Sequence, residues 1–135
     1  MTLLLEVITP EKVIYKNEVN EIIAPTVNGE ITILPNHAPL LTKIAPGELT
    51  IKKGSSLQLL AITGGFLEIN NNKVSVLADY AVRAEDIEVA KAQEAQKRAE
   101  KLMKEKTSDK DFAIAEAEFR RAILELKVAN KRRHH

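Results

Sequence analysis

The feature that most constrains the fold of this chain is an abrupt change in composition near residue 84. All five glycines and all five prolines lie before residue 66, whereas the stretch after residue 84 is dominated by Ala, Glu, Lys, Arg and Gln. Glycine and proline supply the backbone angles of turns, and the second set consists of good helix formers. The sequence therefore predicts two domains, a β domain over residues 1–84 and a helical hairpin over residues 85–133. The final His134 and His135 are either native or a tag remnant, and no function is assigned to them.

The first domain has the pattern of a small antiparallel β-sandwich or barrel. Short alternating runs rich in β-branched residues extend from Leu3 to about Val82, as expected for strands. Turn signals such as Asn28-Gly29 and Pro46-Gly47 separate them. The best-defined runs are residues 21–24, 30–34, 49–52, 57–63, 66–69 and 73–77.

The second domain has the pattern of two antiparallel helices. Asp86 is expected to cap a helix that begins at Ile87, and Ser108, with Asp111 three residues later, is expected to cap another that begins just after Thr107. The short connection favours a hairpin. Apolar residues recur at helical spacing along both segments: Val89, Ala92, Ala95, Ala99 and Leu102, then Phe112, Ala115, Phe119, Ala122, Leu126 and Ala129. The seam is mostly alanine.

Composition excludes several classes of function. The chain carries 20 basic and 19 acidic residues and no cysteine, so it has no overall field for nucleic acid, no disulfide and no zinc-thiolate site. No apolar run approaches the roughly 18 residues of a membrane span. Phosphate-binding loops and metal-binding helix motifs are also missing. No catalytic residue and no metal ligand is predicted.

Three features have both a structural and a functional interpretation. His37 between Pro35 and Pro39 is a contact residue on a stiff loop or a general base. Gly64-Gly65 marks a turn, a bulge or close strand packing, or it forms a backbone nest for an anion. The basic residues late in the chain complement a helix dipole or bind phosphates or an acidic protein surface: Arg120, Arg121, Lys127, Lys131, Arg132 and Arg133.

Three segments resemble the epsilon subunits of rotary F-type ATP synthases of the bacterial type. They are Ile33 to Leu40 (ILPNHAPL), Gly64 to Ile69 (GGFLEI) and Val74 to Ala78 (VSVLA), and the resemblance covers essentially the whole chain. It implies a ten-stranded β-sandwich that binds the gamma subunit and rests on the ring of c subunits. The contact residues that it implies are Asn28, Gly29, Glu30, His37, Ala38 and Pro39.

The resemblance also implies a function. It implies a non-catalytic rotor subunit of the central stalk of a proton-translocating ATP synthase, which couples the gamma shaft to the c-ring. The hairpin would fold on the sandwich or extend into the alpha/beta catalytic head and inhibit ATP hydrolysis, with Arg120, Arg121 and Lys127 as a basic inhibitory face. A seam of single methyl groups holds weakly, at about 0.8 kcal/mol per buried CH₂, which suits such a switch. The protein would lie on the cytoplasmic face of a bacterial plasma membrane, peripherally, with membrane contact only through the complex.

Nucleotide binding is the alternative that the resemblance leaves open. Some members bind ATP on the folded hairpin through Ile/Leu-Asp-x-x-Arg-Ala, and the matching residues here are Ile87, Glu88, Lys91 and Ala92. Lysine does not replace the planar fork of arginine. Position 82 is Val and position 125 is Glu, where ATP-binding members carry Glu and Arg, and Arg98 and Arg121 remain as basic contacts. No cofactor is required, and ATP would be a regulatory ligand of a nucleotide-sensing domain.

Overall fold

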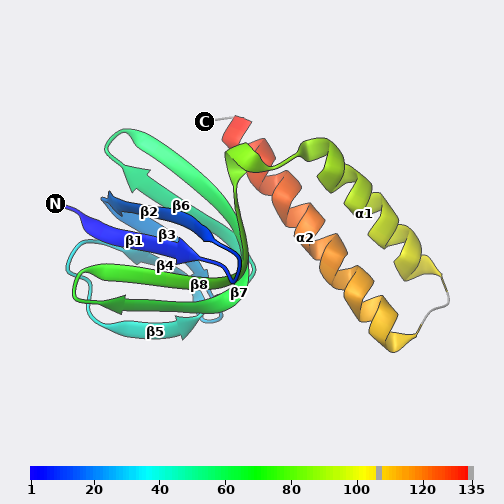
Figure 1. Cartoon of the computed structure of the whole chain (residues 1–135), viewed down its shortest axis with the longest axis horizontal. Helices are drawn as coiled ribbons and strands as arrows, with labels where there is room; N and C mark the ends of the chain where they lie inside the picture. The colour runs from blue at the N-terminus through cyan, green and yellow to red at the C-terminus, as the bar shows by residue number, and fades with distance from the viewer. Residues whose placement is uncertain (106–107, 134–135) are drawn as a thin grey trace. The chain divides into compact units, whose positions relative to one another are not determined.

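The computed structural model describes residues 1–105 and 108–133 (Figure 1). Residues 106, 107, 134 and 135, which include the closing histidine pair, lie outside this description. The chain divides into two compact units, Met1–Arg83 and the part that begins at Ala84. Within the described ranges, no helix is long and apolar enough to cross a membrane.

The first unit is a single hydrogen-bonded sheet that closes around one core. Its order is β2-β1-β8-β7-β6-β3-β4, and β5 pairs with β7 off this path. The pairing of β1 with β8 is parallel and the other pairings are antiparallel. The strands are β1 Leu3–Ile8, β2 Val13–Val19, β3 Glu21–Thr26, β4 Gly29–Ile33, β5 Leu40–Lys43, β6 Gly47–Lys53, β7 Ser56–Asn70 and β8 Lys73–Arg83.

Strand β7 differs from the sequence prediction, because the two runs predicted at 57–63 and 66–69 form one strand of 15 residues. Its first half pairs with β6 and its second half with β5, while β8 pairs with it from Leu60 to Asn70. Gly64 and Gly65, with φ of 62° and 101°, let the strand continue between its two partners. Counted over the described residues, the unit therefore has eight strands where the resemblance implied ten.

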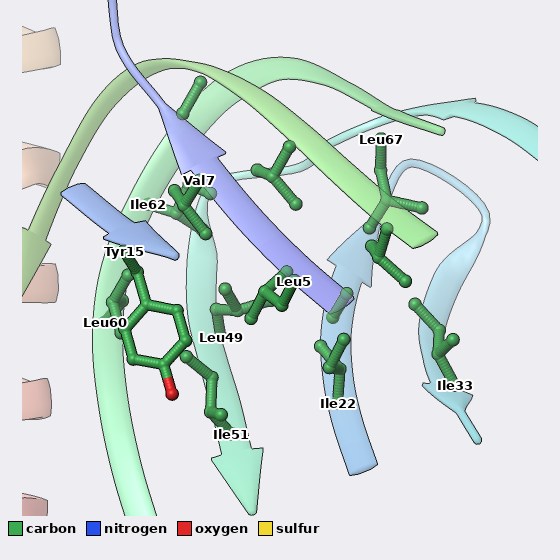
Figure 2. Packing of buried hydrophobic residues seen from close by; sticks show 14 of the residues in the cluster. Leu5, Val7, Tyr15, Ile22, Ile33, Leu49, Ile51, Leu60, Ile62 and Leu67 are labelled. Carbon is green, nitrogen blue, oxygen red and sulfur yellow. The ribbon is translucent and has the colours of Figure 1, made fainter. Parts of the chain in front are cut away.

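The core follows from strand alternation. Along β1, Leu3, Leu5 and Val7 are buried and the residues between them are not, because successive side chains point to opposite faces. Figure 2 shows Leu5, Val7 and residues of β2, β3, β4, β6 and β7 packed into one cluster. Each large side chain that is fully buried contributes about 1.5–3 kcal/mol to folding. This packed core holds the strands of the first unit in fixed positions, so the backbone positions that carry its surface side chains are also fixed in place.

The second unit opens with a short 3-10 turn, Ala84–Asp86, followed by helix α1, Val89–Lys104. The prediction that Asp86 caps a helix beginning at Ile87 is wrong. Asp86 belongs to the turn, and the Ile87 amide donates to the Ala84 carbonyl at 3.2 Å. Glu88, with extended backbone angles, is the N-cap, and its side chain makes no capping hydrogen bond. Local turn formation therefore moved the helix start along the chain.

Helix α2, Asp109–Arg133, begins as its capping residue predicts. The Ser108 hydroxyl accepts a hydrogen bond from the Asp111 amide at 3.1 Å, which satisfies one of the unpaired donors of the first turn. The two helices pack on each other, and the alanine seam is confirmed: the buried residues include Ala92, Ala99, Ala115, Ala122 and Ala129.

Candidate interaction surfaces

Four apolar side chains lie in a row on the outer face of the first unit. Phe66 of β7 pairs with Leu77 of β8, Leu77 pairs with Ile8 of β1, and Ile8 pairs with Val13 of β2. Directly paired residues point to the same face. Phe66, Leu77 and Val13 are 49%, 55% and 54% exposed. We call Phe66, Leu77, Ile8 and Val13 the apolar row.

A groove of about 650 Å³ runs beside the apolar row. Ile8, Phe66 and Leu77 form part of its wall, and Lys43 and Asp79 bring one charge of each sign. A mostly apolar groove with few charges has the make-up of the core of a protein–protein interface.

Gly64 and Gly65 line the same groove, which decides between their two interpretations. A side-chain carbon on Gly65 would lie 2.9 Å from the Ala78 Cα, and one on Gly64 would lie 3.1 Å from the Asp79 carboxyl carbon. The pair thus permits close strand packing. A carboxylate at this position repels an anion, which disfavours the backbone nest.

The predicted contact residues Asn28, Gly29 and Glu30 lie in the turn between β3 and β4 and at the start of β4. The Thr26 hydroxyl, buried within it, donates to the Gly29 carbonyl at 2.5 Å and accepts from the Asn28 amide at 3.2 Å. The Val27 amide donates to the Lys43 carbonyl at 3.1 Å, which fixes the turn beside one end of β5. Asn28, Gly29 and Glu30 are exposed.

The other predicted contact residues, His37, Ala38 and Pro39, lie between β4 and β5. The structure therefore separates them from residues 28–30 by the length of β4, about 3.4 Å per residue. His37 Nδ1 lies 2.7 Å from the Ala38 carbonyl oxygen, and since a carbonyl only accepts, a hydrogen bond here requires Nδ1 to be the donor. Strand β4 is an edge of the sheet, so this edge joins the two predicted contact stretches.

Ion pairs engage several cations of the helical unit that were predicted as ligands. Lys91 pairs with Glu88 at 3.1 Å. Arg121 pairs with Glu125 at 3.3 Å, and Arg120 pairs with Glu116 at 3.3 Å. A carboxylate therefore already neutralises part of each charge.

The remaining residues of the candidate nucleotide site differ in how accessible they are to a ligand. Ala92 is buried in the seam at 5% exposure, and Ile87 precedes α1. Arg98 and Lys127 are exposed. Within the described part of the chain, no group of three or more His, Asp or Glu side chains is placed to hold a metal ion.

The apolar row is the feature that sequence reasoning missed. Its signal was nevertheless present in β8, where Leu77 occupies the outward phase of an alternating stretch whose other outward residues are Lys73, Ser75 and Asp79. An apolar residue in the polar phase of a half-buried strand is a sign of a contact surface.

A β-sandwich followed by a two-helix hairpin, with an apolar row directed outward, defines a docking subunit of a larger assembly. Two family models cover almost the whole chain. Residues 2–84 match the ATP synthase delta/epsilon chain β-sandwich domain, and residues 85–130 match the long α-helix domain of the same chain.

Similar bacterial proteins are ATP synthase epsilon chains, in agreement with the two family models. The chain is 47% identical over 132 residues to an ATP synthase epsilon chain of Dehalococcoides mccartyi, which covers 97% of this chain and 94% of that one. It is 43% identical over 134 residues to that of Herpetosiphon aurantiacus, with 99% and 98% covered. The chain belongs to the ATP synthase epsilon chain family, and it is a subunit of that complex that is not itself catalytic.

Solved structures share the fold at lower identity. A chain in the Euglena gracilis mitochondrial ATP synthase aligns with a TM-score of 0.76 at 23% identity, covering 99% of this chain and 82% of that one. A chain in the central stalk and c-ring of the Tetrahymena thermophila mitochondrial ATP synthase aligns with a TM-score of 0.61 at 18% identity, covering 96% and 97%.

Proposed function

We propose that the chain is a central-stalk subunit of a proton-translocating ATP synthase that couples the gamma subunit to the c-ring, and that its helical hairpin inhibits ATP hydrolysis. The family supports the first part, and the solved structures of similar fold are chains of assemblies that include a c-ring. The complex would sit at the cytoplasmic face of the bacterial plasma membrane, which this chain touches only through its partners.

The apolar row is the observation that carries the coupling proposal. Three half-exposed side chains, Phe66, Leu77 and Val13, lie on one rigid sheet. A partner that covers this apolar surface would gain about 25 cal/mol of favourable free energy per Å² removed from water. The rigid sheet has little conformational entropy to lose on binding. Gamma is the partner that we assign to this row and to the groove beside it.

The edge strand β4 is the surface that we assign to the c-ring. It carries Glu30 at its start and is followed by the stretch that contains His37. An exposed edge offers backbone donors and acceptors as well as side chains. Glu30→Ala and His37→Ala should each weaken binding to a purified c-ring complex while leaving gamma binding intact.

Binding of purified gamma tests the coupling proposal directly. Phe66→Ser with Leu77→Ser should weaken gamma binding about 10- to 100-fold in titration calorimetry, because interface energy concentrates in a few apolar anchors. Leu57→Ser is the matched control, since Leu57 is 36% exposed and lies outside the apolar row. Unchanged gamma affinity of the double variant, with its fold intact by circular dichroism, would contradict the assignment.

The hairpin supports a regulatory role through its seam. The buried contacts of α1 are made by Ala92 and Ala99, so the packed arrangement is stabilised by few methyl groups and is easily exchanged for another. Deleting residues 85–135 should leave gamma binding intact and raise the ATPase activity of the reconstituted catalytic head. Loss of gamma binding by the truncated chain would overturn the division of labour between the two units.

Nucleotide binding remains the alternative proposal, and the ion pairs argue against it. Lys91 pairs with the carboxylate of the N-cap residue Glu88, and Arg121 pairs with Glu125 of its own helix. Each carboxylate competes with a phosphate for the same charge. We expect Mg-ATP to bind weakly or not at all in calorimetry. Low-micromolar binding that Arg98→Gln or Arg121→Gln abolishes would establish the chain as a nucleotide sensor instead.

A further inference from the structure

A second pocket in the first unit lies away from the apolar row and has a different chemistry. Its volume is about 270 Å³, and strands β2, β6, β7 and β8 supply its lining. Three cationic side chains line it, Lys16, Lys53 and Arg83, and the described residues that line it include no acidic side chain. Ser56 adds a hydroxyl. The positive charge of this lining favours an anionic ligand.

The cation at its inner end is held in place. Arg83 Nε donates to the Ile14 carbonyl at 3.1 Å, and its guanidinium carbon lies 5.5 Å from the centre of the Tyr15 ring. Figure 2 shows that ring among the buried side chains of the core. A guanidinium that is fixed by a hydrogen bond and an aromatic ring loses little entropy when it meets an anion.

The other two cations differ in their surroundings. Lys16 lies 3.8 Å from a Glu6 carboxylate oxygen, a long contact. Among the described residues, Lys53 has no carboxylate within ion-pair distance. Its charge is therefore available to a ligand.

Gln58 supplies the observation that narrows the class of anion. Its side-chain oxygen is buried and has no hydrogen-bond partner among the described residues, and Gln58 lines the same pocket. A buried acceptor without a donor costs about 1–3 kcal/mol. A ligand with a proton to donate would satisfy this oxygen, and the cationic lining favours an anion, so the two features together describe an anion that keeps a proton.

We propose that this pocket binds a phosphate group, with Lys53 and Arg83 facing the charged oxygens and Gln58 accepting a hydrogen bond from the P–OH. Inorganic phosphate has one more ionisable proton than a phosphate ester, whose last proton leaves at about pH 6, so it still carries a P–OH at neutral pH, whereas sulfate has none to donate. The small volume suits a phosphate rather than a whole nucleotide. Arg83 is the last residue of β8 and of the first unit, so the bound anion would contact the end of the strand that leads into the second unit.

Titrating the full-length chain with inorganic phosphate at neutral pH tests the proposal. Phosphorus NMR and calorimetry measure the binding. Phosphate should saturate one site and bind more tightly than sulfate. Lys53→Gln should weaken phosphate binding about tenfold, because that is the loss in affinity expected when one charge-assisted hydrogen bond is removed. Lys52→Gln is the matched control, since Lys52 is the neighbouring residue, pairs with Glu21 at 3.0 Å and does not line the pocket.

Two further arms identify what the pocket recognises. Gln58→Leu should remove the preference for phosphate over sulfate while leaving sulfate affinity unchanged. ADP carries a terminal phosphate that is mostly without a proton at neutral pH, since its last proton leaves at about pH 6, so ADP should bind more weakly than inorganic phosphate. Absence of saturable phosphate binding, equal affinity for sulfate, or an equal loss in Lys52→Gln would each overturn the proposal.

Discussion

The side-chain oxygen of Asn72 accepts a hydrogen bond from the backbone amide of Asn36 at 2.8 Å, which ties the β7–β8 turn to the loop that carries His37. The Asn72 side-chain nitrogen donates to the Thr2 carbonyl at 2.9 Å. One side chain therefore joins three segments that are distant in sequence. The predicted ring-contact stretch at 37–39 depends on it for its position.

Replacing Asn72 should loosen this junction. Asn72→Gly keeps the positive φ of 59° accessible but removes both hydrogen bonds, and it should lower the free energy of unfolding by about 1–3 kcal/mol in urea titration. Asn71→Gly is the control, because Asn71 has a similar φ of 51° and is exposed. Equal stability of the two variants would show that Asn72 acts through its backbone conformation alone.

Gly65 should be the least replaceable glycine of the chain. Gly65→Ala forces a methyl group against the Ala78 backbone and a φ of 101° onto an L-residue, and together these should cost about 2–4 kcal/mol. Gly54→Ala should cost only about 1 kcal/mol, since nothing lies within 4 Å of its added carbon. Thermal melts of both variants measure the difference. Similar melting temperatures would mean that β7 tolerates a shift at this point.

The Ser108 cap should govern the start of α2. Ser108→Ala leaves the Asp111 amide without its partner and should destabilise the first turn by about 1 kcal/mol. Amide exchange at the start of α2 should accelerate, while the β-strands exchange as before. Ser55→Ala, an exposed turn substitution, is the control. Unchanged exchange in Ser108→Ala would show that water replaces the cap without loss.

The sequence predicted best where one hydrogen bond or one repeat decides the structure. Ser108 caps its helix because its hydroxyl reaches an amide three residues away, and the alanine seam follows from spacing alone. Asp86 failed as a cap because a 3-10 turn includes it. The continuity of β7 depends on two partner strands that no local pattern encodes.

Of the candidate interaction surfaces, some could be predicted from the sequence and one could not. The contact residues at 28–30 and 37–39 came from a resemblance, and their role stays a prediction. The apolar row became visible only when strand pairing aligned Phe66, Leu77 and Ile8 across three strands. Each residue is ordinary in its own segment, since single exposed apolar side chains are common. Their alignment depends on register, which short-range sequence patterns do not determine.

The seam of the hairpin should reject larger side chains. Ala99 is 0% exposed, so Ala99→Leu overpacks the contact of α1 with α2 and should destabilise the hairpin by about 1–3 kcal/mol. Amide exchange should then accelerate in both helices. Ala113→Leu on the exposed face of α2 is the control and should change little. If exchange is unchanged in Ala99→Leu, the seam has room for three extra carbons. The helices are then not held by the close methyl contacts on which the proposed switch rests.

Tyr15 should make stability depend on pH at the alkaline end. Burial raises the pKa of its hydroxyl above the ordinary 10.0, and the charge of Arg83 offsets part of that rise. The folded chain thus keeps a proton that the unfolded chain loses above about pH 10. Its contribution to stability is present below pH 10 and is lost as pH rises through the folded pKa, at most about 1.4 kcal/mol per pH unit.

Tyr15→Phe tests this dependence. The variant cannot lose a proton there, so its free energy of unfolding should fall less steeply than that of the parent above pH 10. Lysine titration contributes equally to both chains and cancels in the difference. Phenolate absorbance of the folded parent should also show one tyrosine titrating late. Parallel stability curves for parent and variant would mean that solvent reaches the hydroxyl at position 15, and that the fixed aromatic wall beside Arg83 is less closed than its burial indicates.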